Sequence, residues 1–208
     1  MNKLDIDNNV VTIPKNEKVE LHIFDYQNKK ITYNLEANSK LVIYQYGIDI
    51  DNDITINLNG KNSEVEYHYS TINYNDHKYN ILVVHNEENT TSNIYNHGLN
   101  VYSKKLDFNI TGKVIKKANK SICNQENQII NLEDGDSTIL PNLLIDNYDV
   151  ISNHSAYIGK FKDDLLFYLM SRGISKRVSY DLLIRSFLIN GLTSNEDISK
   201  LEEEIKKI

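Results

Sequence analysis

Hydrophobic and polar residues alternate with a period of two along most of the chain, from about residue 10 to residue 157. The runs are short and are bounded by Asn, Asp and Gly; examples are the segments 19–23, 54–58, 65–69 and 106–110. Such alternation is typical of half-buried strands. Because no helical periodicity interrupts these runs, parallel βαβ units are not expected. The pattern predicts a mainly β core domain at residues 1–158.

A weak internal repeat runs through the same region. A leucine, a short spacer, an Asn-Ser or Asp-Ser pair and an apolar residue recur at 35–41, 58–65 and 132–139. The Asn-Ser or Asp-Ser pair favours a turn through local side-chain hydrogen bonds. Asn38 and Asn62 are 24 residues apart, a suitable length for one coil of a β-solenoid. Ordinary turns in a β-sandwich remain an alternative.

The period becomes helical after Gly159. Asp163 and Asp164 favour the positive N-terminal end of a helix dipole, and Gly173 is placed to end that helix. The expected apolar side consists of Leu165, Leu166, Phe167, Leu169 and Met170. The sequence therefore predicts a first helix that follows the last strand directly.

Two more helices are expected after the first. Ser175 can cap a helix that runs to about Asn190, with Gly191 as its stop. Its expected apolar residues are Val178, Leu182, Leu183, Phe187 and Ile189. Ser194 followed by Asp197 has the capping-box spacing for a last helix over 195–208. Residues 159–208 are thus predicted to form a small α-helical domain.

Composition narrows the range of partners. The chain has 208 residues and a formal net charge of −6, which argues against nucleic acid as a partner. No apolar run approaches the roughly 20 residues that cross a bilayer, and the N-terminus lacks the features of a signal peptide. The single cysteine, Cys123, fits a reducing compartment. We therefore expect a soluble cytoplasmic protein.

Residues 154–174 contain the most informative motif, with the sequence His-Ser-Ala-Tyr-Ile-Gly, an acidic spacer and Leu-Phe-Tyr-Leu-Met-Ser-Arg-Gly-Ile. It resembles the signature of the SufB/SufD family, the scaffold proteins of iron–sulfur cluster assembly. Upstream, 85–92 is similar to the family's His-x-x-x-x-Thr-x-Ser strand, and 108–114 and 125–150 match further segments. The resemblance covers about residues 81–190. Ser155 and Tyr157 depart from the family's usual Gly and Thr.

The resemblance implies a right-handed parallel β-helix core followed by a small C-terminal α-helical domain. It implies a SufD-like scaffold subunit, not an enzyme, that pairs edge to edge with a SufB-like subunit. The helical domain would dock the SufC ATPase, whose ATP-driven motion would shift the β-helix interface. The chain itself would bind no nucleotide, since Gly112-Lys113 lacks the remainder of a phosphate loop.

The resemblance also implies candidate ligands for a transient iron–sulfur cluster or iron at the subunit interface. The family histidine that matches His154 faces the partner's cysteine, and imidazole is a suitable iron ligand. The position of the SufB cysteine falls on Glu126, whose carboxylate can also bind iron. Cys123 lies three residues away from that register, so the chain is closer to SufD. The simpler interpretations stay open: a histidine in a corner hydrogen bond, a solvated glutamate at a strand end and a buried structural thiol.

Partner-binding residues are expected in the helical region. Phe167, Tyr168 and Arg172 are of residue types enriched at interface anchors. Taken alone, these residues are as easily explained as core. The resemblance makes them, together with Phe187, the candidates for contact with SufC.

The other histidines show no metal-site spacing and are mostly expected on the surface, with His85 structural; they are His22, His68, His77, His85 and His97. Two other functions stay open. One is a homodimeric β-helix scaffold without metal contact. The other is a β-solenoid carbohydrate-active enzyme, which needs paired carboxylates on adjacent coils.

Overall fold

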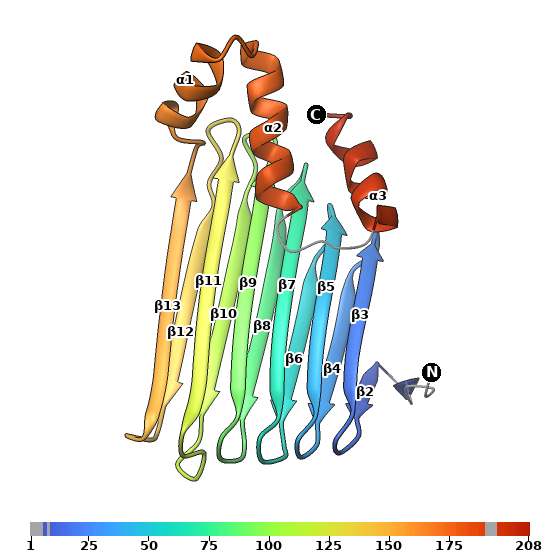
Figure 1. Cartoon of the computed structure of the whole chain (residues 1–208), viewed down its shortest axis with the longest axis vertical. Coiled ribbons are helices and arrows are strands. Elements are labelled where there is room, and N and C mark those ends of the chain that lie inside the picture. Colours follow the sequence, from blue (N-terminus) through green and yellow to red (C-terminus); the bar gives the residue numbers. More distant parts are fainter. Residues whose placement is uncertain (1–5, 8, 190–194) are drawn as a thin grey trace.

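The computed structural model describes residues 6–7, 9–189 and 195–208. Its strands alternate between two sheets that face each other, as in a flattened solenoid (Figure 1). One sheet has the order β1-β2-β4-β6-β8-β10-β12 and the other β13-β11-β9-β7-β5-β3. The strands are β1 (Ile6–Asp7), β2 (Val10–Ile13), β3 (Lys18–Asp25), β4 (Lys29–Leu35), β5 (Lys40–Ile48), β6 (Asn52–Leu58), β7 (Glu64–Asn73), β8 (His77–His85), β9 (Thr91–Asn100), β10 (Leu106–Val114), β11 (Ser121–Asn131), β12 (Thr138–Ile145) and β13 (Val150–Gly159).

The strand pairing confirms the predicted β-solenoid. Apart from the antiparallel β1–β2 pair, the strand pairs of the described residues are parallel. Lys40 pairs with Glu64, which is 24 positions further on, as the repeat predicted. The β-sandwich alternative is wrong, because from β2 onward consecutive strands lie in different sheets and pair with strands one coil away.

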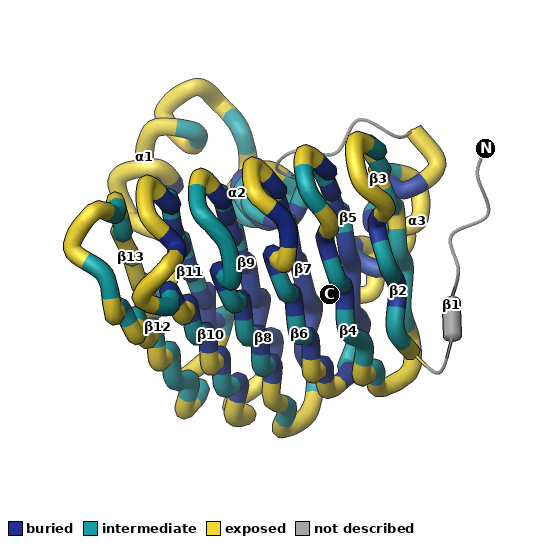
Figure 2. Tube along the Cα trace, turned by 90° about the horizontal axis from the view of Figure 1, so that it is seen from below, coloured by how far each residue is buried: buried dark blue, intermediate teal, exposed yellow. Residues whose placement is uncertain are grey.

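The core lies between the two sheets. In the strands of the middle coils alternate residues face inward and are buried, and Figure 2 shows these buried segments along the space between the two rows of strands. Five aromatic side chains are fully buried there: Tyr33, Tyr67, Tyr69, Tyr79 and Phe108. Tyr69 and Tyr79 stack across the core with ring centroids 4.1 Å apart. Each coil completes its core only against its neighbours, which is why the coils stack.

The Asn-Ser pairs form one corner of each early coil. Asn38 and Asn62 have φ of 56° and 60°, a left-handed conformation that asparagine tolerates better than most residues. The Asn62 amide donates to Asn38 Oδ1 at 2.8 Å, and Ser63 Oγ donates to the Gly60 carbonyl at 2.8 Å. The prediction of a third copy of the repeat at 132–139 is wrong. This segment connects β11 to β12 and so lies at the opposite corner of the coil. At the corner formed by Asn38 and Asn62 in the early coils, the later coils have Asn89 and Lys120, with φ of 58° and 57°.

The helices begin and end near the predicted residues. They are α1 (Asp163–Ser171), α2 (Lys176–Leu188) and α3 (Asn195–Ile205). Gly173 follows α1 with a φ of 84°, and the Ser175 side chain accepts a hydrogen bond from the Val178 N–H at the start of α2. The predicted signals at Asn190, Gly191 and Ser194 lie outside the described residues. Within the described part of the chain, no helix has both the length and the apolar character needed to cross a bilayer.

The helices bury other residues than the sequence suggested. Helices α2 and α3 pack against the outer face of the six-stranded sheet. The helices contribute Ile184, Leu188, Leu201 and Ile205 to this hydrophobic cluster, and the strands contribute Tyr46, Ile72, Leu99 and Ile130. The predicted apolar faces are wrong at five exposed residues: Leu165, Phe167, Met170, Val178 and Leu182. The other five, Leu166, Leu169, Leu183, Phe187 and Ile189, are buried or half-buried. The reason is that the sheet covers only one side of each helix. The predicted boundary between a β domain (residues 1–158) and a helical domain (residues 159–208) stays a prediction. The hydrophobic cluster between α2, α3 and the six-stranded sheet contains residues from both sides of this boundary.

Candidate functional site

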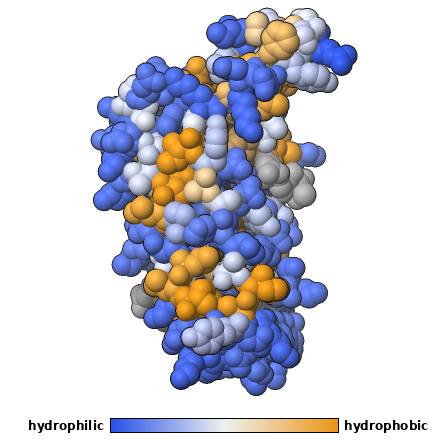
Figure 3. All heavy atoms as spheres, turned by 90° about the vertical axis from the view of Figure 1, so that its left-hand side faces the viewer, coloured by the Kyte–Doolittle hydropathy of each residue, from blue (hydrophilic) through white to orange (hydrophobic). Residues whose placement is uncertain are grey.

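The solenoid ends in two strands that no further strand covers. Among the described residues, β12 and β13 are the outermost strands of their sheets on this side, so their outward backbone groups have no β partner. Figure 3 looks onto this end of the molecule and shows two hydrophobic patches separated by hydrophilic surface. Its exposed large apolar residues are Leu140, Leu144, Ile151, Tyr157 and Ile158. We call this surface, with both strands, the open end.

An uncovered strand edge is a template for pairing with another chain, and contiguous exposed apolar surface marks interaction sites. The resemblance implied pairing at an edge of the β-helix, but the apolar residues of the open end were not identified from the sequence, although a signal was present. In β12 the outward positions Leu140 and Leu144 are apolar, whereas their register partners in β10 are Asn109 and Lys113. The signal is thus a last strand that is apolar on both faces, after earlier strands that alternate between apolar and polar residues. This pattern could have revealed the open end.

His154 lies in the middle of β13, within the open end. It pairs in register with Gln125 of β11, which is buried and faces the solenoid interior. Since paired residues in a parallel sheet point to the same side, His154 is also on the interior side, and it is exposed because no coil follows. Its ring forms no hydrogen bond with the described residues, so a corner hydrogen bond does not explain this histidine.

Glu126 lies on the neighbouring strand but faces the other way. It pairs with Ser155, one residue after His154, and its side chain is on the outer face of the sheet, where it accepts a hydrogen bond from Gln128 Nε2 at 2.9 Å. It is half-buried in the middle of β11 and not at the expected strand end. Glu126 and His154 border one shallow surface pocket, but the register places their side chains on opposite faces of the sheet. No cluster of three or more His, Cys, Asp or Glu suited to a metal is found in the described residues.

Cys123 is buried in the solenoid interior, as expected for a structural thiol. Burial raises the pKa of this thiol, although a hydrogen bond with Ser92 acts in the opposite direction. Gly112 lies directly opposite, and a Cβ atom there would come within 2.5 Å of Cys123 Sγ. A protonated, enclosed thiol is a poor iron ligand.

His85 is the structural histidine of the motif at 85–92. Its Nδ1 lies 2.8 Å from Thr90 Oγ1 and its Nε2 2.9 Å from Ser92 Oγ, which accounts for the His-x-x-x-x-Thr-x-Ser spacing. Burial lowers the pKa of His85 to about 4. His85 faces the core, as expected of a structural residue, whereas the expectation of a surface position is wrong for His97, which lies under α2.

The predicted partner-binding residues divide into two groups. Phe167 is 76% exposed, Tyr168 is also exposed, and the Arg172 guanidinium lies 5.3 Å from the centre of the Tyr168 ring. These three residues, which we call the α1 surface, are not core. Phe187 lies elsewhere: it is half-buried, with its ring 4.9 Å from that of His97.

Comparison with known proteins gives the family. A family model described as "SUF system FeS cluster assembly, SufBD core domain" matches residues 7–187. The chain belongs to the SufB/SufD family. A curated SufB/SufD relative, the iron-sulfur cluster assembly protein SufD of Bacillus subtilis (strain 168), is 33% identical over 134 residues. The match covers 60% of this chain and 30% of that relative, so the chain spans less than a third of its length.

The family assignment confirms the interpretation of residues 154–174 and extends it. The sequence resemblance began near residue 81, whereas the SufB/SufD core match begins at residue 7. The early coils share the solenoid geometry without the motif residues. In this SufB/SufD core the signature joins the open end to the α1 surface, because only residues 160–162 separate β13 from α1.

Proposed function

We propose that this chain is a SufD-like scaffold subunit of the SUF iron–sulfur cluster assembly system whose open end pairs with a SufB-like subunit. The observation that carries the proposal is the pair of uncovered strands, β12 and β13, with exposed apolar side chains beside them. An incoming strand would satisfy the free backbone groups of β13, and its side chains would bury Ile151 and Ile158.

His154 is the residue of this chain that we propose as a ligand of iron or of the nascent cluster, which is the cargo of the system. Its imidazole is exposed, has no hydrogen bond to the described residues and lies on the side that a paired subunit would cover. One imidazole cannot hold iron alone, and Glu126 faces away. The remaining ligands would therefore come from the paired subunit, which fits a scaffold that performs no chemistry of its own.

The α1 surface is the proposed docking site of a SufC-like ATPase. It presents two exposed aromatic rings and a guanidinium, the residue types that anchor interfaces. Residues 160–162 are too short to absorb a large displacement of α1. A pull on α1 would therefore be transmitted to β13, which carries His154.

The proposal is tested by coexpression with a SufB-like and a SufC-like subunit, followed by affinity purification. Ile151→Lys is expected to lower recovery of the SufB-like subunit about tenfold or more and to leave the SufC-like subunit bound, since a buried lysine opposes pairing. Phe167→Ala should give the reverse pattern. Tyr102→Lys, at an exposed position away from both surfaces, is the control. Recovery of neither subunit with the unaltered chain would contradict the proposal.

The ligand role of His154 needs a second readout. His154→Ala is expected to leave the complex assembled and to reduce the cluster absorbance formed on reconstitution. Unchanged cluster formation would refute the ligand role and would favour a scaffold without metal contact.

Two other functions have different outcomes in these measurements. If the chain pairs with itself through the open end, sedimentation velocity will show a dimer that Ile151→Lys dissociates. A carbohydrate-active enzyme is less well supported, because Glu20 and Glu66, in one outward row, are separated by Val42 of the intervening coil. Each of these two carboxylates is also within 2.9 Å of a histidine nitrogen.

A further inference from the structure

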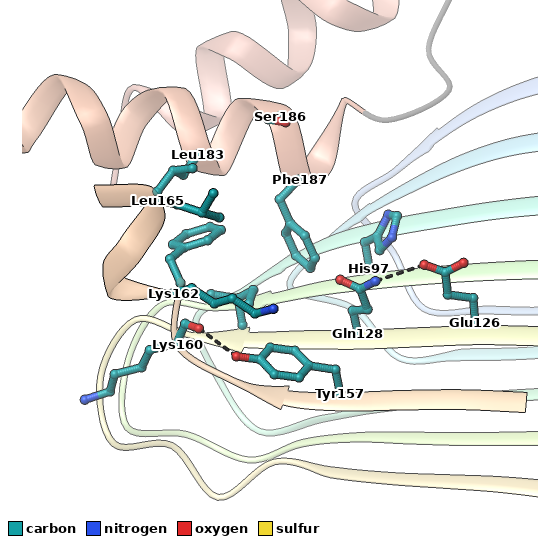
Figure 4. A pocket seen from close by; sticks show the side chains of 12 residues that line it. His97, Glu126, Gln128, Tyr157, Lys160, Lys162, Leu165, Leu183, Ser186 and Phe187 are labelled. Atoms are coloured by element: carbon teal, nitrogen blue, oxygen red, sulfur yellow. Dashed lines mark hydrogen bonds between the residues drawn. The ribbon is translucent and has the colours of Figure 1, made fainter. Parts of the chain in front are cut away.

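A groove with a volume of about 600 Å³ lies between the outer face of the six-stranded sheet and the α1–α2 pair (Figure 4). Its floor includes His97 of β9, Gln128 of β11 and Tyr157 of β13, and Phe187 of α2 lies over it. This size is within the range of small-molecule sites, which combine apolar walls with a few polar groups. The function proposed above does not use this groove.

His97 supplies an unpaired polar group in the groove. Its side chain is only 6% exposed, yet its ring nitrogens form no hydrogen bond with any described residue. Burial lowers the pKa of His97 to about 4, so the ring is neutral near pH 7 and offers one N–H donor and one acceptor. Buried polar groups are almost always hydrogen-bonded. Since His97 lines the groove, its ring nitrogens are available there to water or to a polar group of a ligand.

Lys162 supplies a positive charge. In Figure 4 its ammonium group points into the groove, and it forms no ion pair with the described residues. Lys160 lies nearby but points away, with its Nζ 2.9 Å from Asp134 Oδ1. The groove is also lined by apolar side chains, among them Phe161 and Phe187, and by the amide of Gln128.

The charged side chains of the groove restrict the net charge of a ligand that can bind there. One free ammonium matches one negative charge, and Glu126, at the His97 end of the groove, disfavours a second one. Phe161 and Phe187, with ring centroids 6.1 Å apart at 86°, offer an aromatic wall for a flat apolar body. The ligand must therefore be charged at one end, flat in the middle and hydrogen-bonding at the other end.

We infer that the groove binds a small aromatic monocarboxylate that carries a hydroxyl group at the opposite end. Lys162 pairs with the carboxylate, the aromatic walls contact the ring, and His97 hydrogen-bonds the hydroxyl. This inference does not require subunit pairing: the groove lies on the outer face of the sheet and borders the open end only at Tyr157.

The test uses the 208-residue chain and three probes, with dissociation constants from NMR titration of the His97 imidazole signals. The probes are 4-hydroxyphenylacetate, its uncharged amide and phenylacetate. We expect 4-hydroxyphenylacetate to bind about fivefold more tightly than either of the others, which corresponds to about 1 kcal/mol for each end group. Equal affinity for all three probes, or no saturable shift, would overturn the inference.

Two variants assign the contacts. Lys162→Ala should abolish the preference for the acid over the amide, whereas Lys160→Ala, the matched lysine control, should retain it. His97→Leu, followed by ligand-observed NMR, should abolish the preference for the hydroxyl. If both lysine variants lose affinity equally, general electrostatic attraction explains the binding and the assigned site is wrong. If His97→Leu does not fold, the His97 imidazole signals of the unaltered chain still decide its role: they should shift more with 4-hydroxyphenylacetate than with phenylacetate, and equal shifts would refute the contact.

Discussion

In the six-stranded sheet, inward-facing residues that pair in register form rows along the solenoid. One of these rows is mostly apolar in the early coils and polar in the last two. Its members in register are Leu21, Ile43, Tyr67, Ile94, Gln125 and His154. The early members are mostly apolar and belong to one large hydrophobic cluster. The last two are polar, and His154 is exposed at the open end. The early coils are therefore built for stability, and the last coils present hydrogen-bonding groups toward a surface that a partner can cover.

The neighbouring interior row also gains polar residues in β9 and β11, although Gln45 is a polar early member and the apolar Ala156 ends the row. Ile23, Gln45 and Tyr69 are followed by Asn96 and Asn127, and the Asn96 amide donates to Asn127 Oδ1 at 2.7 Å. The coils near the open end thus replace part of their apolar packing with side-chain hydrogen bonds. Such bonds contribute less per residue than apolar burial but specify the geometry of the last strands more closely.

The largest expected effect is the difference in free energy of unfolding between substitutions in the early coils and at the open end. Ile56→Ala, in the core of an early coil, should lower the free energy of unfolding by about 2–5 kcal/mol, because it removes buried methyl groups and leaves a cavity. His154→Ala should change it by no more than about 0.5 kcal/mol, since the side chain is exposed. Urea unfolding measures both. A cost for His154→Ala comparable to that of Ile56→Ala would contradict the division.

The next effect is the pH dependence of the buried histidines. Burial lowers the pKa of His85 to about 4, whereas in the unfolded chain it is about 6.5. The unfolded state therefore takes up a proton first as the pH falls. Stability should be complete above about pH 7.5 and decrease as the pH falls from 6.5 toward 4. At pH 5 the loss from His85 is about 2 kcal/mol, and His97 acts in the same direction.

His85→Asn checks the source of this pH dependence. We expect the variant to be less stable than the unaltered chain at pH 7.5, because it loses interior hydrogen bonds. Its urea midpoint should fall less steeply between pH 7.5 and 5. An unchanged slope would mean that His85 is not the group responsible.

The smallest effect concerns the polar interior near the open end. Asn127→Ala leaves the buried Asn96 amide without its acceptor and should cost about 1–3 kcal/mol. Asn124→Ala is the matched control on the same strand. It removes a partly buried hydrogen bond to Asn93 and an exposed one from Asn153, both on the outer face, and should cost about 0.5–1 kcal/mol. Equal costs in urea unfolding would show that the interior hydrogen bonds carry no special weight.

Local features of the fold were predictable from the sequence. The period of two gave the strands, because alternate residues of a strand necessarily face opposite sides. Asn38 and Asn62 predicted the corners, since a left-handed turn is decided by a single residue and its neighbours. Ser175 and Gly173 predicted the limits of the helices in the same way. The signature at 154–174 predicted the family.

Features that depend on distant residues were decided only by the tertiary structure. Glu126 and His154 are 28 positions apart, and the length of the connecting coil sets the register that places them on opposite faces. His97 looked like a surface residue until α2 packed over it, and Phe187 lies beside it for the same reason. The sequence by itself determined which elements form and to which family they belong. The stacking of the coils and the packing of the helices decided which side chains meet, because those contacts join residues that no local pattern relates.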